Sequence, residues 1–246
     1  MKALWQRYLD GIPEYLARHY WWAYLSPFGV WFFDHRPVIN PILFGQYQAI
    51  LNEVMRRYET APSPRTLQVT CAYGALTPTL TRSAATGELH LMDAAAIQLR
   101  AAQQKIPADA RRPSFARMNA ESLAYADNSF DTIILFFLLH ELPPDARTRT
   151  LDEALRTLKP GGRVLIADYG HITRSHLLHR VPLLRALLEA LEPFLREFWH
   201  GDLDASLMAS AARSSLQLKA CAGTAIFRGF YRVREYRAQE QLHNTR

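Results

Sequence analysis

The feature that most constrains the fold is an uninterrupted apolar run, IILFFLL, at positions 133–139. A strand with one wet face alternates apolar and polar residues, whereas a strand covered by helices on both faces is apolar throughout. The run is far shorter than the roughly 20 residues that a membrane-spanning helix needs. We therefore predict that the segment from Asp131 is the central strand of an open parallel sheet.

Strand-like and helix-like segments alternate on both sides of this run. The other strand-like segments are 67–71, 88–92, 115–118 and 163–168, and the helical ones are 94–105 and 145–158. Pro143 and Pro144 precede the second helix, and the turn sequence KPGG ends it. This alternation predicts βαβ units, and hence an α/β fold with a mostly parallel sheet of about seven strands and helices on both faces.

A boundary is expected near residue 62, where ETAPSPR should end a helix. We predict a helical, aromatic-rich cap over 1–62 that binds the acceptor, and an α/β domain over 63–246. In the second part, a stripe of leucines from Leu177 to Phe198 indicates an amphipathic helix that Pro182 and Pro193 start or kink. We expect the stripe to face the core, with the lining of an apolar acceptor pocket as the alternative.

Charge and cysteine content bear on location and partners. The net charge of +6 favours anionic surfaces, nucleic acid and phospholipid alike. No nucleic-acid-binding module is recognisable, so no nucleic-acid partner is expected. The two cysteines are expected to be reduced, and no continuous apolar signal segment opens the chain. We expect a cytoplasmic protein in peripheral contact with the inner face of the plasma membrane, helped by Trp and Tyr in YWWAYLSPFGVWFF.

Ligands of an open parallel sheet bind outside the carboxyl ends of its strands. The loop TCAYGALT, 70–77, follows one strand, and Asp93 ends the next. Asp93 lies 19 residues (93 − 74) past Gly74, close to the offset of ~20 at which a carboxylate meets a ribose hydroxyl in nucleotide-binding units. Capping of the following helix by Asp93 is an equally open interpretation.

The segments MNAESLAYADNSFD, LHEL and KPGGRVLIADY follow in that order. Over residues 65–170 the chain resembles class I S-adenosylmethionine-dependent methyltransferases, especially quinone C-methyltransferases, with their Rossmann-like fold. The resemblance implies that Asp93 holds the ribose of S-adenosylmethionine, that Asn119 and Ala120 contact its adenine, and that the Gly74 loop lies beneath its methionine part. The cofactor-binding residues expected on this basis are Gln68, Thr70, Tyr73, Gly74, Asp93, Asn119, Ala120 and Phe136.

The first motif departs from the usual acidic-x-Gly-x-Gly-x-Gly. Gln68, Thr70, Ala72 and Gly74 stand at its four defining positions, so only the last glycine remains. The loss of the acidic residue removes an anchor for the methionine ammonium group. Two interpretations stay open: a weakened or lost methyltransferase, or an enzyme that uses the same cofactor in an unusual way.

A narrower resemblance covers nearly the whole chain. The head at 12–47 and the segments LQVTCAYGALT, ILFFLLHEL, ALLEALEPF and IFRGFY are similar to those of the rhodoquinone-biosynthesis methyltransferase-like proteins. The resemblance implies conversion of ubiquinone to rhodoquinone, in which an amino group from S-adenosylmethionine replaces a methoxy group. We interpret Gln68 as leaving that amino group free to react. The alternatives are methylation of a quinone or another lipophilic molecule, and cofactor binding without catalysis.

Two residues that end strands are the candidates for catalysis. His140 is expected to move protons near its ordinary pKa, with a purely structural role as the alternative, and Tyr169 to polarise a quinone carbonyl. A divalent ion such as Mn²⁺ near Asp168 stays open, and no metal ligands are assigned. The oligomeric state is likewise open. The residues expected to bind the quinone are Tyr20, Tyr24, Trp31 and Tyr47.

Overall fold

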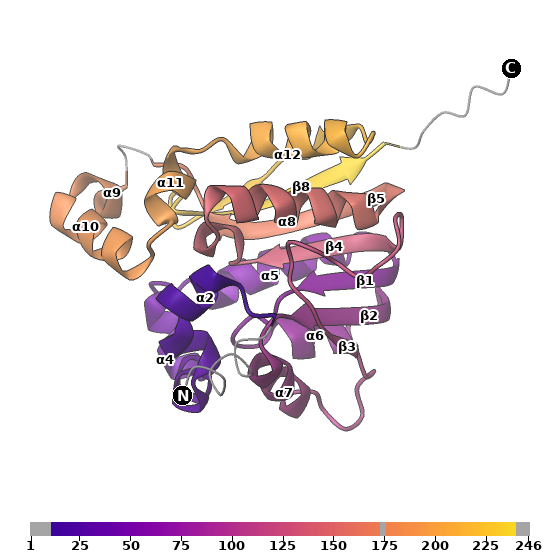
Figure 1. The fold of residues 1–246 in the computed structure, drawn as a ribbon, viewed down its shortest axis with the longest axis horizontal. Helices are drawn as coiled ribbons and strands as arrows, with labels where there is room; N and C mark the ends of the chain where they lie inside the picture. Colours follow the sequence, from indigo (N-terminus) through magenta and orange to yellow (C-terminus); the bar gives the residue numbers. More distant parts are fainter. Residues whose placement is uncertain (1–10, 173–175, 240–246) are drawn as a thin grey trace, which may run out of the picture.

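Eight strands form one mixed sheet in the computed structural model, which describes residues 11–172 and 176–239 (Figure 1). The first ten residues of the predicted cap therefore lie outside the described part. The strands are β1 (Ser63–Val69), β2 (Thr86–Asp93), β3 (Ser114–Arg117), β4 (Phe130–Phe136), β5 (Leu158–Tyr169), β6 (Leu218–Ala220), β7 (Thr224–Ile226) and β8 (Tyr231–Ala238).

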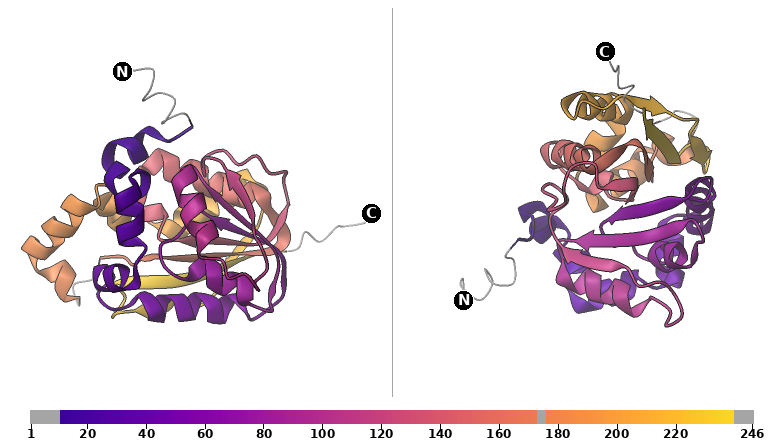
Figure 2. Two further views of the ribbon diagram at one scale, coloured as in Figure 1. Left: turned by 90° about the horizontal axis from the view of Figure 1, so that it is seen from below. Right: turned by 90° about the vertical axis from the view of Figure 1, so that its right-hand side faces the viewer.

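Helices cover both faces of the sheet, and a group of short helices from the N-terminal part lies at one end of it (Figure 2). The short N-terminal helices are α2 (Glu14–His19), the π-helical turn η1 (Trp21–Leu25), α3 (Pro27–Phe33) and α4 (Arg36–Ile42). They are followed by the longer helix α5 (Tyr47–Tyr58). The remaining helices are α6 (Leu76–Arg82), α7 (Ala96–Gln104), the 3₁₀ turn η2 (Leu139–Glu141), α8 (Pro144–Thr157), α9 (Leu177–Arg180), α10 (Pro182–Leu191), α11 (Leu195–His200) and α12 (Leu203–Arg213).

The strand order is β3-β2-β1-β4-β5-β8-β6, and β7 pairs with β8. Strands β1 to β5 pair in parallel, whereas β8 runs antiparallel to β5. The chain moves outward from β1 to β3 and then returns to the other side of β1, so the order reverses between β1 and β4. Such a switch point opens a crevice at the carboxyl ends of the strands. The predicted fold class is confirmed, with eight strands where about seven were expected.

The central strand ends earlier than its apolar run. Strand β4 stops at Phe136, and Phe137 has a φ of 52°, which turns the chain into η2. The expected KPGG turn instead bulges within the long strand β5: Phe130 pairs with Leu158 and Thr132 with Arg163, so the four residues 159–162 stand opposite Asp131 alone. The early end of β4 places His140 in a tight turn rather than on the strand.

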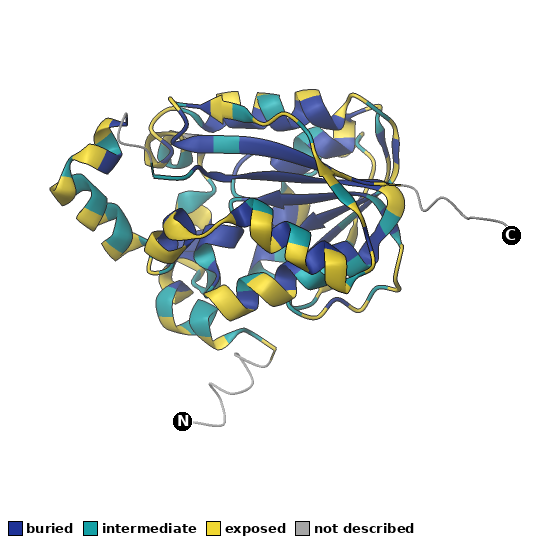
Figure 3. Ribbon diagram, turned by 90° about the horizontal axis from the view of Figure 1, so that it is seen from above, coloured by how far each residue is buried: buried dark blue, intermediate teal, exposed yellow. Residues whose placement is uncertain are grey.

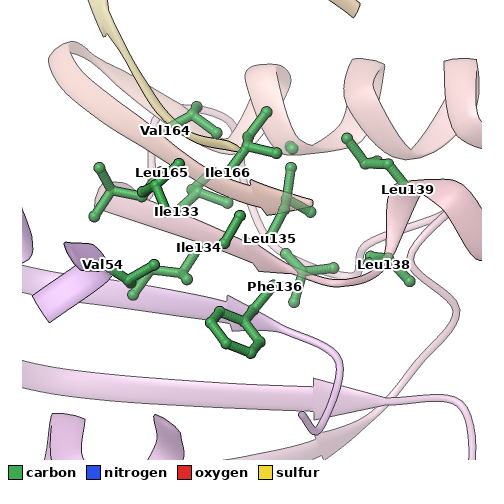
Figure 4. Packing of buried hydrophobic residues seen from close by; sticks show 14 of the residues in the cluster. Val54, Ile133, Ile134, Leu135, Phe136, Leu138, Leu139, Val164, Leu165 and Ile166 are labelled. Carbon is green, nitrogen blue, oxygen red and sulfur yellow. The ribbon is translucent and has the colours of Figure 1, made fainter. Parts of the chain in front are cut away.

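The core is centred on β4 and β5, as expected for strands that are apolar on both faces. Ile133, Ile134, Val164 and Ile166 are buried together, and Val54 of α5 packs with them (Figure 4). Helix α5 thus shares the core of the sheet, although it precedes the predicted boundary near residue 62. That boundary lies directly before β1, and the division into two domains stays a prediction.

The leucine stripe does not behave as one core-facing helix. It forms α9, α10 and α11, broken near Pro182 and Pro193, and only its end at Leu195 and Phe198 is buried. Of the stripe residues in α10, Leu184 and Leu188 are half-buried and Leu188 packs against the core, whereas Leu191 is 55% exposed. Helix α10 projects from one end of the molecule, where exposed and half-buried positions alternate along it (Figure 3). The expectation is met only in part there, because periodicity defines an apolar face but not the element that covers it.

Within the described residues, no helix is both long enough and apolar enough to cross a membrane.

Candidate functional site

A cavity lies at the carboxyl ends of the parallel strands, between the sheet and the N-terminal helices. The loop after β1, the end of β2 and the turn after β4 form one wall, and side chains of 13–47 form the opposite wall. Eleven of the fourteen site residues expected from sequence line it, and Gln68, Gly74 and Trp31 do not. The eleven are Tyr20, Tyr24, Tyr47, Thr70, Tyr73, Asp93, Asn119, Ala120, Phe136, His140 and Tyr169.

Gln68 shapes the first loop from behind. Its side chain is fully buried, its Nε2 donates to the Thr70 carbonyl (3.0 Å), and its Oε1 accepts from the Thr77 hydroxyl (2.9 Å). Thr70 has a φ of 68°, a left-handed conformation that glycine adopts freely and β-branched residues rarely do. The loop therefore keeps a backbone shape suited to glycine although Thr70 carries a side chain.

The N-terminal helices hold the same loop from outside. Gly74 has a φ of 84°, and a side chain there would collide with the hydroxyl of Tyr47. Its N–H donates to Asp34 Oδ1 (2.8 Å), which also accepts from Lys105 (2.7 Å). Gly74 thus lets the loop approach these helices closely, which explains why it is retained although it does not line the cavity.

Tyr73 joins the loop to the π-helical turn η1. Its ring stacks on Tyr24 with 5.3 Å between centroids and 8° between planes. Its hydroxyl donates to the Ala23 carbonyl (2.6 Å) and accepts from Gln98 (2.9 Å). The two tyrosines, one from each predicted unit, form a continuous aromatic surface along the cavity.

Asp93 ends β2 at the edge of the cavity. Its Oδ1 accepts from the Ala95 N–H and its Oδ2 from the Cys71 N–H, both at 2.8 Å. Burial raises the pKa of Asp93 to about 6, against the effect of these two backbone donors. The capping residue of α7 is Ala95, so Asp93 does not cap that helix. The Cys71 thiol also hydrogen-bonds this carboxylate, which leaves a lone pair for a ribose hydroxyl.

Asn119 and Ala120 lie in the loop after β3. The Asn119 Oδ1 accepts from the Glu121 N–H (3.0 Å), which leaves one lone pair on that oxygen. Ala120 is buried in the same wall, and Phe136 closes it from the end of β4. A carboxylate, an amide and small apolar residues along one wall are the groups that would hold the ribose and adenine of S-adenosylmethionine.

His140 forms a buried pair with Asp168. Its Nδ1 lies 2.7 Å from Asp168 Oδ1, and the other oxygen of Asp168 accepts from the Leu139 N–H (3.0 Å). Burial disfavours the charged imidazole, but the Asp168 carboxylate outweighs it and raises the pKa of His140 to about 9. Imidazole in this pair is protonated at neutral pH, contrary to the expectation of an ordinary pKa.

Tyr169 follows Asp168 on β5 and packs edge-on against His140, with ring centroids 4.7 Å apart. Burial raises the pKa of Tyr169 well above its ordinary value, so it stays a neutral phenol that can donate a hydrogen bond. Asp168 already accepts from His140 and from the Tyr169 N–H (2.8 Å). These donors leave Asp168 a poor ligand for the divalent ion considered from sequence.

A potential metal-binding group occurs elsewhere in the described residues. His171, Asp202 and Asp204 offer ligand atoms within 4.8 Å of one another, outside the cavity lining. Asp204 is already paired with Arg234 (2.7 Å) and accepts from Tyr236. These contacts account for its position without a metal ion.

The sequence interpretation missed two acidic residues of the cavity. Glu141 accepts a hydrogen bond from the Tyr24 hydroxyl, and Glu192, at the end of α10, accepts one from the Tyr20 hydroxyl (3.0 Å). Burial, reinforced by Glu192, raises the pKa of Glu141 to about 8, and burial also raises the pKa of Glu192. Glu141 could have been suspected from its place beside His140, whereas LEPF carries no signal that Glu192 is buried.

Trp31 is placed differently from the other residues expected to bind the quinone. It is 60% exposed on α3 and contacts Phe28 and His35 rather than the cavity. Tyr20, Tyr24 and Tyr47 do line the cavity. Helix α3 contributes no residue to the cavity lining, and Trp31 lies on the exposed side of this helix, opposite the buried Gly29 and Val30.

Part of the chain is similar to known methyltransferases. Residues 66–162 match the family model described as a methyltransferase domain. A demethylmenaquinone methyltransferase of Lactiplantibacillus plantarum is 33% identical over 132 residues, which cover 52% of this chain and 55% of that protein. The chain thus spans about half the length of this curated relative.

Solved structures share the fold. The YcgJ protein of Bacillus subtilis superposes with a TM-score of 0.56 and 17% identity over 79% of this chain and all of that chain. The N-methyltransferase NodS of Bradyrhizobium japonicum, solved with S-adenosylhomocysteine, gives 0.51 and 15% over 97% and 98% of the two chains. Residues 66–162 thus match a methyltransferase domain, and the chain shares the fold of these solved structures.

Proposed function

We propose that this protein is an S-adenosylmethionine-dependent enzyme of quinone metabolism that converts ubiquinone to rhodoquinone, replacing a methoxy group by an amino group from the cofactor. The observation that carries the proposal is the composition of the cavity. One wall has the groups that suit the cofactor, the facing wall is aromatic and apolar, and two buried carboxyl groups, Glu141 and Glu192, also line the cavity. The two halves meet without an intervening element, so donor and acceptor would lie side by side.

The cofactor half would act by binding and orienting. S-adenosylmethionine supplies the group that is transferred. Asp93 would accept from the ribose hydroxyls, and Asn119 from the adenine amino group. Thr70 and Ala72 would present backbone to the methionine part. Holding two reactants in one geometry is itself a large source of rate acceleration.

The acceptor half suits a flat ring with an apolar tail. Tyr20, Tyr24 and Tyr47 offer ring faces, and Ile39 and Leu43 add an apolar floor. Tyr169 would donate a hydrogen bond to a ring carbonyl, because its phenol is neutral. A largely apolar pocket with a few placed polar groups is typical of sites for small lipophilic ligands.

Position 68 supports amine transfer over methyl transfer. No carboxylate stands there, and Gln68 uses its amide within the loop rather than toward the cavity. A donor amino group held by an acidic anchor would stay protonated and turned away from the acceptor. In this cavity the other acidic groups are Glu141 and Glu192.

Methylation of a quinone or another lipophilic molecule is the second candidate. The match to a demethylmenaquinone methyltransferase favours it. Both candidates need the same cofactor site and differ only in the group transferred, so the product distinguishes them.

The test is expression in a ubiquinone-producing bacterium that lacks rhodoquinone, followed by mass spectrometry of its lipid extract. We expect aminoquinone with the parent protein and none with Asp93→Ala, which removes the ribose-binding carboxylate. Cells that contain folded, cofactor-binding protein but no aminoquinone would contradict amine transfer. A newly methylated quinone would favour the second candidate.

We also propose peripheral contact with the cytoplasmic face of the membrane that holds the quinone. Every large hydrophobic residue that is exposed in the described part lies in 21–44 or 177–191. Both segments adjoin the cavity: Tyr20 binds Glu192, and Phe194 packs on Tyr15 with ring centroids 6.4 Å apart. Trp and Leu side chains next to a pocket for a lipid-soluble molecule suit a bilayer interface.

A further inference from the structure

We infer that Glu141, positioned by Tyr24, is the group that accepts a proton from the donor's ammonium nitrogen, a role that sequence had suggested for His140. The inference rests on the proposed function, because an amino group must lose a proton before its nitrogen can attack an acceptor. It concerns a residue of this chain that the first-motif and strand-end patterns did not indicate.

Glu141 lies in the same cavity as the groups that suit the donor. Its side chain lines that cavity together with Thr70 and Asp93 of the cofactor half and the tyrosines of the cap. One oxygen, Oε1, accepts from the Tyr24 hydroxyl and lies 3.9 Å from His140 Nε2. The bond to Tyr24 fixes the direction of the carboxyl group and leaves its second oxygen for another partner.

The charges around Glu141 make the cavity receptive to a cation. Glu192 is a second buried carboxyl group of the same lining. Among the described side chains, no Lys or Arg forms an ion pair with either group, and the hydroxyls of Tyr24 and Tyr20 are their hydrogen-bond donors. His140 is a cationic neighbour of both groups and lies 3.9 Å from Glu141 Oε1, but burial outweighs its effect and raises the pKa of both carboxyl groups. An entering ammonium group would supply a further positive charge.

His140 is unsuited to the role. Its Nδ1 is held by Asp168 at 2.7 Å, and Asp168 is fixed in turn by backbone N–H groups of Leu139 and Tyr169. The pair keeps the imidazole protonated at neutral pH, with a pKa of about 9. A protonated imidazole has no lone pair with which to accept a proton.

The proton step balances without any further reactant. Binding of the positive ligand lowers the pKa of Glu141, so its carboxyl group releases a proton to solvent and becomes a carboxylate. An N–H bond of the ammonium group then breaks, its electron pair stays on nitrogen, and the proton forms a new O–H bond on Glu141.

The test measures proton release on binding. Titration calorimetry of the full chain with S-adenosylhomocysteine, which carries the same ammonium group, is run at pH 7 in buffers of different ionisation enthalpy. We expect a substantial fraction of a proton to be released by the parent protein and little by Glu141→Gln. Glutamine keeps an acceptor for Tyr24 but cannot ionise. Glu197→Gln, which changes an exposed carboxylate of α11 outside the cavity lining, is the control and should keep the release.

A second readout is the pH profile of product formation. Tyr24→Phe removes the hydrogen bond that stabilises the carboxylate and should shift the acid limb of the profile to higher pH, while Glu141→Gln should lose at least a hundredfold in rate. Proton release that is unchanged in Glu141→Gln would overturn the inference. If the parent forms no aminoquinone, the proposed function fails, and the binding titration still decides the role of Glu141.

Discussion

Single residues in the first loop are under opposing demands. Thr70 adopts a φ of 68° at a position where the related motif has glycine, and such a conformation costs a non-glycine residue about 1–2 kcal/mol. We expect Thr70→Gly to be more stable than Thr70→Ala by about 1 kcal/mol, because alanine keeps the Cβ atom. Denaturant unfolding of the two variants measures the difference. Equal stability would show that the loop relaxes around Thr70.

Gln68 affects both the proposed reaction and the stability of the first loop. Gln68→Glu replaces the amide donor that faces the Thr70 carbonyl by a carboxyl oxygen. We expect the free energy of unfolding to fall by about 1–3 kcal/mol and aminoquinone formation to be lost. Thr77→Val, which removes only the hydroxyl that donates to Gln68, is the control. A Gln68→Glu variant that binds the cofactor and forms aminoquinone like the parent would disprove our interpretation of this position.

Three buried groups make stability depend on pH in one direction. Folding raises the pKa of Asp93 from 3.8 to about 6, of Glu141 from 4.5 to about 8 and of His140 from 6.5 to about 9. A raised pKa stabilises the protonated folded form, and this contribution is lost as the pH rises through the folded value. We expect the free energy of unfolding to fall between pH 5 and 9, by up to about 1.4 kcal/mol per pH unit for each titrating group.

Denaturant unfolding across that pH range checks this dependence. Glu141→Gln should remove the part that develops between pH 4.5 and 8 and leave the remainder. A parent protein whose stability is constant from pH 5 to 9 would mean that water or another ion compensates these groups.

At the scale of secondary-structure elements, α10 is the part whose environment remains open. The double variant Leu183→Gln, Leu187→Gln should reduce binding to anionic vesicles about tenfold without lowering the melting temperature, because both side chains are already exposed in solution. Co-sedimentation at low salt is the measurement. Arg56→Gln, at an exposed position of α5 outside both hydrophobic segments, is the control. Undiminished vesicle binding by the double variant would exclude α10 as the contact.

The sequence predicted the elements that are governed by local periodicity and turn residues. The strands at 67–71, 88–92 and 163–168 and the helix at 145–158 were located within a few residues of β1, β2, β5 and α8. Asp93 was found because its place at a strand end determines its place in the site. The predicted burial of the apolar face of α10 was met only in part, because the surroundings of that helix depend on where the chain goes after Pro193.

The acidic pair escaped sequence reasoning for a similar reason. Glu141 meets Tyr24 across 117 positions of sequence, and Glu192 meets Tyr20 across 172. The pKa of a carboxyl group depends on such contacts and on burial, neither of which a local pattern contains. The pairing of His140 with Asp168 was missed in the same way, because His140 lies in the turn η2 and Asp168 lies near the end of β5.

At the scale of the whole molecule, three features lie together at one end of the sheet. The N-terminal helices close the cavity and hold the first loop through Asp34 and Tyr73. The cofactor half lies on the sheet side, and the exposed hydrophobic segments lie beside the opposite wall. This arrangement would let a lipid-soluble acceptor pass from the bilayer to the donor without crossing water.

The most direct test of this account follows the nitrogen. Purified protein is incubated with ubiquinone in vesicles and S-adenosylmethionine that carries ¹⁵N in its amino group and ¹³C in its methyl group, with Asp93→Ala in parallel. The account predicts a quinone that has lost one methoxy group and gained ¹⁵N without ¹³C, and no product with the variant. A quinone that gains ¹³C and no ¹⁵N would contradict amine transfer.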